Sequence, residues 1–207
     1  PRHKMERPGQ AWQGSGFIPE LQSLFYPDFD SDKPDAVDGV KWSLSRHRML
    51  DAQRDYVTRT WPGSMAAKLG LYGLSAGEGS TGKSYHVGGV DLPDQAVLHP
   101  HYILMSAALT EPPKTYALMR RLEKAKLFPP WGMVETVPVN CSGYLPMNGS
   151  LNAGFEALGA YHLFAKNRGI TNTIYSASRH SSELRRAVQL FFPVKQAQSA
   201  ETTNSAE

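Results

Sequence analysis

The sequence predicts an all-α fold of about five or six helices joined by long loops. Three observations lead to this fold class. Apolar residues recur at helical spacing in several stretches, capping residues stand before these stretches, and the segments between them are rich in Gly and Pro. At 207 residues, with 41% apolar and 20% charged residues, the chain has the length and composition of one globular domain.

The first two helices are expected between residues 38 and 109. One begins at the capping residue Asp38 and ends near Thr60. Its apolar positions near helical spacing are Val40, Leu44 and Met49. The stretch HYILMSAAL, which follows Pro100, predicts a short buried helix.

Three further helices are expected in the second half of the chain. Thr110, followed by Pro112, begins the first of them. Ser150 caps the clearest helix, which ends at Gly169, and Ser178 caps the last one. The apolar faces of these helices are, in order, Leu118, Leu122 and Ala125; Leu151, Phe155 and Leu158; and Leu184, Val188 and Phe191.

One folded domain with loose ends is expected. Residues 1–15 are polar and basic and form the predicted loose N-terminal segment, and residues 16–194 form the domain. The tail KQAQSAETTNSAE, residues 195–207, has almost no apolar content and is predicted to be disordered. The chain begins with Pro rather than Met, which predicts a processed product or a fragment.

Composition and charge exclude several classes of function. The net charge is only +3 and the basic residues are scattered, so no nucleic-acid partner is predicted. No apolar run reaches the roughly 20 residues that a membrane helix needs, so no membrane span is predicted. The single cysteine, Cys141, rules out an internal disulfide framework, and no cofactor or metal site is predicted.

The two long loops, at about 61–99 and 128–149, are predicted to carry the function. Loops longer than about 12–15 residues are usually functional or disordered. Each of these two contains a motif that combines a Gly turn, an aromatic ring and a carboxylate. The motifs are LYGLSAGEG, which ends in Glu78 and Gly79, and PPWGMVE, which ends in Glu135.

Residues 71–84 fit three different patterns. The string GEGSTGKS matches a P-loop, but the Gly and Pro residues after Ser84 prevent the helix that a P-loop needs. The string GLSAG matches a nucleophile elbow around Ser75; it also lacks the following helix, and a serine hydrolase that uses Ser75 is kept as an alternative. In the third pattern, a carbohydrate-active loop, Tyr72 offers its ring to a sugar and Glu78 supplies an acid, a base or a hydroxyl-binding group.

The order of the motifs resembles the bacterial glucoamylase-like domain family, to which β-1,2-glucan-cleaving glycoside hydrolases belong. The matching residues are, in chain order, Ser45 and Arg46, residues 72–79, His99 and Pro100, residues 130–135, and residues 151–154. The resemblance covers roughly residues 15–165. It implies a partial (α/α)6 toroid that corresponds to the C-terminal portion of the family's domain.

The resemblance implies acid/base hydrolysis of a bacterial glucan of the β-1,2 type by two paired carboxylates, Glu78 and Glu135. One carboxylate protonates the leaving oxygen, and the other activates water or attacks the anomeric carbon. The residues themselves do not assign these two roles. The predicted substrate-binding residues are Arg46, Tyr72, Tyr85, His86, Trp131, Tyr144 and Asn152.

Three departures from the family pattern leave an alternative open. The family has Asp where this chain has Glu78, Glu135 and Asn152, and an amide cannot act as a general base. A non-catalytic glycan-binding relative, or an incomplete fragment, is therefore the alternative to an active hydrolase.

A full toroid has twelve helices, so the missing N-terminal half or a second copy of the chain is an expected partner. The resemblance also implies a periplasmic or secreted location.

Overall fold

The computed structural model describes residues 14–79, 85–92 and 96–193, and most of these residues are helical. The all-α fold class is confirmed. The described α-helices are α1 Phe17–Phe25, α2 Trp42–Thr60, α3 Met65–Leu69, α4 His101–Met105, α5 Pro112–Lys124, α6 Ser150–Arg168, α7 Thr173–His180 and α8 Ser182–Phe191. Two short 3-10 helices, η2 Pro27–Asp30 and η3 Ala107–Leu109, are also described. Residues 1–13 of the predicted N-terminal segment and the predicted tail at 195–207 lie outside the described residues.

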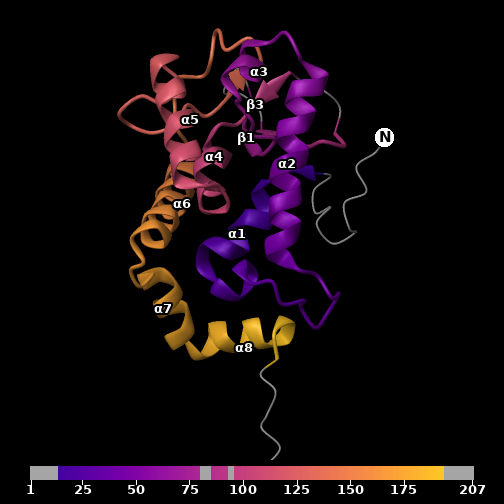
Figure 1. Ribbon diagram of the computed structural model, residues 1–207, viewed down its shortest axis with the longest axis vertical. Helices are drawn as coiled ribbons and strands as arrows, with labels where there is room; N and C mark the ends of the chain where they lie inside the picture. The colour runs from indigo at the N-terminus through magenta and orange to yellow at the C-terminus, as the bar shows by residue number, and fades with distance from the viewer. Residues whose placement is uncertain (1–13, 80–84, 93–95, 194–207) are drawn as a thin grey trace, which may run out of the picture.

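The helices form two long sides with α1 between them (Figure 1). One side is α2, and the other is made by α5, α4 and α6, while α7 and α8 lie at the lower end of the view. α6 packs against α4 at very short range, since a Cβ added at Gly159 would lie 2.0 Å from the Leu104 carbonyl oxygen. Among the described helices, none is long and apolar enough to cross a membrane.

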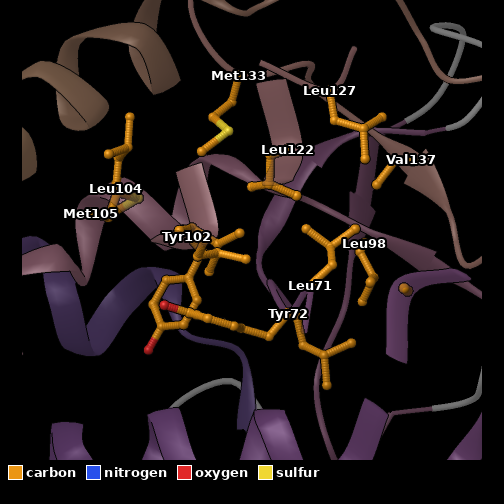
Figure 2. Packing of buried hydrophobic residues seen from close by; sticks show 14 of the residues in the cluster. Leu71, Tyr72, Leu98, Tyr102, Leu104, Met105, Leu122, Leu127, Met133 and Val137 are labelled. Carbon is orange, nitrogen blue, oxygen red and sulfur yellow. The ribbon is translucent and has the colours of Figure 1, made fainter. Parts of the chain in front are cut away.

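The main hydrophobic core joins α4 and α5 to the loops that follow α3 and α5 (Figure 2). Its labelled members include Leu71, Tyr72, Leu98, Tyr102, Leu122, Leu127, Met133 and Val137. Leu127, Met133 and Val137 all belong to the segment after α5 and are 0% exposed. The motif PPWGMVE is therefore anchored in the core through Met133, which fixes the backbone that leads to Glu135.

Two short antiparallel pairs of strands are formed by the long loops. β1 Ala76–Glu78 pairs with β2 Tyr85–Val87, and Gly77 is opposite His86. β3 Val97–Leu98 pairs with β4 Val137–Pro138, so the first long loop is bonded to the second. A further bridge joins Thr136 to Leu145. The pairing of β3 with β4 brings the two motifs together although Glu78 and Glu135 are 57 residues apart in the chain.

The start predicted for α2 is wrong, whereas its end at Thr60 is confirmed. The helix begins at Trp42, and Asp38 does not cap it. Asp35 is the residue that organises this segment, because its Oδ1 accepts backbone hydrogen bonds from Val37 and Asp38, both at 2.8 Å. The resulting turn occupies the residues that the prediction had placed in the first turn of the helix.

The helix predicted from Ser150 to Gly169 is present as α6, and Gly169 ends it in the left-handed conformation. Its N-cap is Gly149 rather than Ser150, and Leu151 is 64% exposed, so Leu151 is not part of the buried face. The last predicted helix corresponds to α8, but its predicted cap Ser178 is wrong, because Ser178 lies inside α7. Ser181 caps α8, where its Oγ accepts a hydrogen bond from the Leu184 N–H at 3.3 Å.

Candidate active site

The carboxylate of Glu135 lies at the junction of the two motifs and the start of α6. It is 2% exposed and accepts three hydrogen bonds. Its Oε1 accepts from the backbone N–H of Glu78 at 3.1 Å and from Nδ2 of Asn152 at 2.7 Å. Its Oε2 accepts from the backbone N–H of Gly149 at 2.9 Å. The structure therefore brings together three residues that the sequence analysis singled out: Glu78, Glu135 and Asn152.

The second predicted carboxylate, that of Glu78, is at the end of β1 and is half-buried. Its backbone is held on both sides, by Glu135 at the N–H and by the Thr136 hydroxyl, which donates to the Glu78 carbonyl. Tyr85 is opposite Glu78 in the strand pair. Burial raises the pKa of Tyr85, and the charges of Glu135 and Glu78 raise it further. Both carboxylates are therefore close enough to Tyr85 to affect the pKa of its phenol.

Gly77 is required for this close arrangement. A Cβ at this position would lie 2.6 Å from Glu135 Oε1 and 2.7 Å from His99 Nδ1. Real Cβ atoms do not approach other atoms so closely, so a larger residue would force the hairpin away from Glu135. The glycines of the first motif thus serve the packing of the hairpin against the second motif.

Two buried histidines, His86 in β2 and His99 after β3, connect the two motifs. His86 Nδ1 is 2.7 Å from His99 Nε2, and His99 Nδ1 is 3.3 Å from the Glu135 carbonyl oxygen. Burial and the neighbouring His86 lower the pKa of His99 to about 3, so the His99 ring is neutral at neutral pH. His86 is 7% exposed. The predicted ligand His86 is thus paired with His99 and helps to connect β2 to the second motif.

Glu156 is a site residue that the sequence analysis missed. Its Oε2 accepts from the backbone N–H of Met133 at 3.1 Å, and Nδ2 of Asn148 is 3.3 Å from both of its oxygens. Burial raises the pKa of Glu156 to about 7, and the charge of Glu135 contributes to this increase. Glu156 follows Asn152 by one helical turn on α6, and this i, i+4 spacing is the signal that could have found it.

Glu156→Gln is expected to remove a pH-dependent loss of stability. Between the ordinary pKa of 4.5 and the folded value of about 7, folded Glu156 keeps its proton while the unfolded chain loses it. The free energy of unfolding therefore falls as the pH rises through this window, by about 3 kcal/mol in total. The variant should gain stability relative to the wild type when urea denaturation is moved from pH 5 to pH 8.

The charge-neutral side chain also suits the local hydrogen bonds. The Gln Oε1 can accept from the Met133 N–H, and an Asn148 amide turned by 180° points its buried, unpartnered Oδ1 at the new NH2 group. The matched control is Glu111→Gln, an exposed substitution on the N-cap of α5. If the difference between Glu156→Gln and the wild type is the same at pH 5 and pH 8, Glu156 does not hold a proton in the folded state.

The predicted aromatic ligands divide into exposed and covered rings. Tyr85 is 67% exposed, Trp131 is 50% exposed, and Tyr144 is half-buried against the core. Tyr72 is only 2% exposed, since Tyr102 packs edge-on against it and the Arg54 guanidinium lies 4.9 Å from its ring centroid. Exposed rings are available to stack on a sugar, whereas the faces of Tyr72 are covered by protein.

Arg46, another predicted ligand, is in a buried ion pair. Its Nη2 is 2.8 Å from Glu20 Oε2 on α1, and its Nη1 is 2.8 Å from Asp30 Oδ1 on η2. The side chain of Arg46 is 3% exposed. In this structure Arg46 joins α2 to α1 and η2 and does not present its charge to solvent.

The nucleophile-elbow pattern in the first motif lacks the geometry that a serine nucleophile needs. Ser75 is 0% exposed, and its Oγ is 3.2 Å from Nε2 of the buried His101. β1 follows Ser75 and pairs with β2, so the helix that would expose a nucleophile is replaced by a strand. Residues 80–84 of the P-loop string lie outside the described residues. Among the residues that the structure describes, no group of His, Cys, Asp and Glu is arranged to hold a metal ion.

Comparisons with known proteins find similarity in structure only. No protein-family model and no curated protein matches the sequence. The structure is similar to a candidate glucoamylase from Bacteroides fragilis NCTC 9343, with a TM-score of 0.68 and 15% identity over 87% of this chain and 41% of that one. It is also similar to a β-1,2-glucanase from Parabacteroides distasonis, with a TM-score of 0.66 and 16% identity over 84% of this chain and 24% of that one.

A third similar structure is an endo-β-1,2-glucanase from Chitinophaga pinensis in complex with sophorotriose and glucose, with a TM-score of 0.58 and 14% identity over 83% of this chain and 40% of that one. The chain spans about two fifths of the length of the candidate glucoamylases that it matches. It therefore has the fold of part of a glucoamylase-like helical toroid.

Proposed function

We propose that this chain is a glycoside-hydrolase-like protein whose site around Glu135 and Glu78 acts on a glucan. The observation that carries the proposal is the pairing of the two carboxylate-bearing motifs, in which the buried Glu135 carboxylate accepts a hydrogen bond from the Glu78 backbone. Trp131 and Tyr85 are exposed aromatic rings on these same two segments. Aromatic faces beside paired carboxylates are the groups that glycoside hydrolysis uses.

The two carboxylates differ in ways that suit different roles. Glu78 is half-buried at the end of a strand, so its side chain is available to a ligand. Glu135 is buried, and three hydrogen-bond donors fix the direction of its carboxylate. In the proposal Glu78 contacts the scissile bond, while Glu135 is the second carboxylate of the pair and holds the Glu78 backbone in place. β-1,2-Glucan is the proposed substrate, because two of the similar structures are described as β-1,2-glucanases.

Turnover is tested by incubating the full chain with β-1,2-glucan and measuring the release of reducing ends. Glu78→Gln is expected to lower the rate by about 100-fold or more, because the amide cannot exchange a proton with the substrate. Glu111→Gln is the matched control, since it is the same substitution at an exposed position on α5. Circular dichroism confirms that each variant is folded. If Glu78→Gln has the rate of the wild type, Glu78 is not the catalytic group.

A non-catalytic glycan-binding protein is the second candidate, and Asn152 favours it. Its amide donates to Glu135 and cannot act as a base, so the three hydrogen bonds to Glu135 also fit a purely structural carboxylate. This candidate predicts affinity for the glucan in calorimetry without release of reducing ends. Trp131→Ala should then weaken binding, whereas a chain that neither binds nor cleaves the glucan would contradict both candidates.

A further inference from the structure

A cleft lies among α2, α3 and α5, and neither Glu78 nor Glu135 lines it. Its volume is about 400 Å³, within the range of small-molecule sites. Three cationic side chains line it: Arg54 from α2, and Lys114 and Arg121 from α5. Thr58 adds a hydroxyl, while the remaining lining residues are Ala67, Gly70, Leu71, Tyr72, Ala117 and Leu118. The cleft thus combines an apolar floor with positive charge.

The two arginines are held in place by the protein. The Arg54 guanidinium lies over the Tyr72 ring, 4.9 Å from its centroid. Nε of Arg121 donates to the Leu69 carbonyl oxygen at 3.0 Å, which uses only one of its five N–H donors. Fixed guanidinium groups lose little freedom when they bind an anion.

No carboxylate among the lining residues neutralises the positive charge of the cleft. None of its lining residues, all in the described part of the chain, is an Asp or a Glu. Two of the cations pair with carboxylates that do not line the cleft: Asp51 is 3.9 Å from Arg54, and Glu111 is 3.1 Å from Lys114. Both carboxylates are largely exposed, so these pairs contribute little and can yield to a stronger partner.

We propose that this cleft binds a small phosphate monoester, such as a sugar phosphate. Arg side chains donate pairs of N–H groups that match phosphate oxygens, and Lys adds a third positive charge. The apolar lining can contact the C–H groups of the sugar, and the Thr58 hydroxyl is near enough to the cleft to meet its hydroxyl groups. The proposal does not depend on the function of the Glu135 site, because neither Glu78 nor Glu135 lines the cleft.

Binding is tested by calorimetry with the full chain and three probes: glucose 6-phosphate, inorganic phosphate and glucose. Glucose 6-phosphate should bind and glucose should not. Arg54→Gln and Lys114→Gln should each weaken the binding of glucose 6-phosphate by about tenfold or more. Lys114 is exposed and its substitution does not threaten folding. Arg168→Gln, on α6 outside the cleft, is the matched control and should leave the affinity unchanged.

The outcomes separate the proposal from its rivals. Equal affinity for inorganic phosphate and glucose 6-phosphate supports the anion site and identifies the free ion as its ligand. Equal affinity for glucose and glucose 6-phosphate overturns the proposal, because the cations then contribute nothing. The proposal is also overturned if Arg54→Gln and Lys114→Gln bind like the Arg168→Gln control, or if none of the three probes binds at millimolar concentration.

Discussion

Replacing Arg46 with Ala is expected to lower the free energy of unfolding by about 3–5 kcal/mol. Arg46 and Glu20 are 2% and 0% exposed, and Arg46 donates to Glu20 Oε2 from both Nε and Nη2. Burial alone would lower the pKa of Arg46, but Glu20 and Asp30 outweigh it and raise the pKa, so the guanidinium stays charged. The substitution leaves the carboxylate of Glu20 buried without its cation.

Urea denaturation followed by circular dichroism measures this loss. The control is Arg59→Ala on the same helix, where the ion pair with Asp55 is exposed and its loss should cost less than about 1 kcal/mol. The double substitution Arg46→Met with Glu20→Leu should recover at least about 1 kcal/mol, because no unpaired charge remains buried. A loss as small as that of Arg59→Ala would show that the ion pair does not hold α2 to α1.

The helices that the sequence predicts well are those whose signals are local. α5 begins at its Pro pair with Leu118 and Leu122 buried on one face, and α6 ends at its Gly. α1 is not among the predicted helices, because Gly16 before it offers no capping side chain. Gly16 instead allows contact with α4, since a Cβ there would lie 2.3 Å from the Tyr102 ring. Such contacts depend on residues far away in the sequence.

The candidate site shows the same division between local and distant causes. The Gly and aromatic residues next to Glu78 and Glu135 are local signals that identify both carboxylates in the sequence. The pairing of the two loops, which brings the carboxylates together, is a distant contact. The position of a residue in a motif does not show whether its side chain is buried. The sequence therefore predicts Tyr72 and Arg46 as ligands, although both side chains are buried in the structure. Glu156 belongs to no motif, and only the fold of the second loop over α6 brings Met133 and Asn148 to it.

Gly159→Ala is expected to lower the free energy of unfolding by about 2–3 kcal/mol. The added Cβ would lie 2.0 Å from the Leu104 carbonyl oxygen and 2.8 Å from the Met105 Cα. Both are backbone atoms of α4, so a side-chain rotation cannot relieve the contact. α4 and α6 would have to separate, and Leu104 and Met105 would lose part of their packing in the core. Thermal and urea denaturation of the variant measure the loss.

Gly154→Ala on the same helix provides the opposite expectation. An added Cβ at Gly154 meets no atom within 4 Å, so only the helix preference acts, and Ala should stabilise the protein by about 0.5–1 kcal/mol. The two variants make the same chemical change in one helix and differ only in what lies beside the new methyl group. Opposite signs would therefore measure the contact between α4 and α6 directly. A gain in stability for both would mean that α6 does not approach α4 as closely as the structure places it.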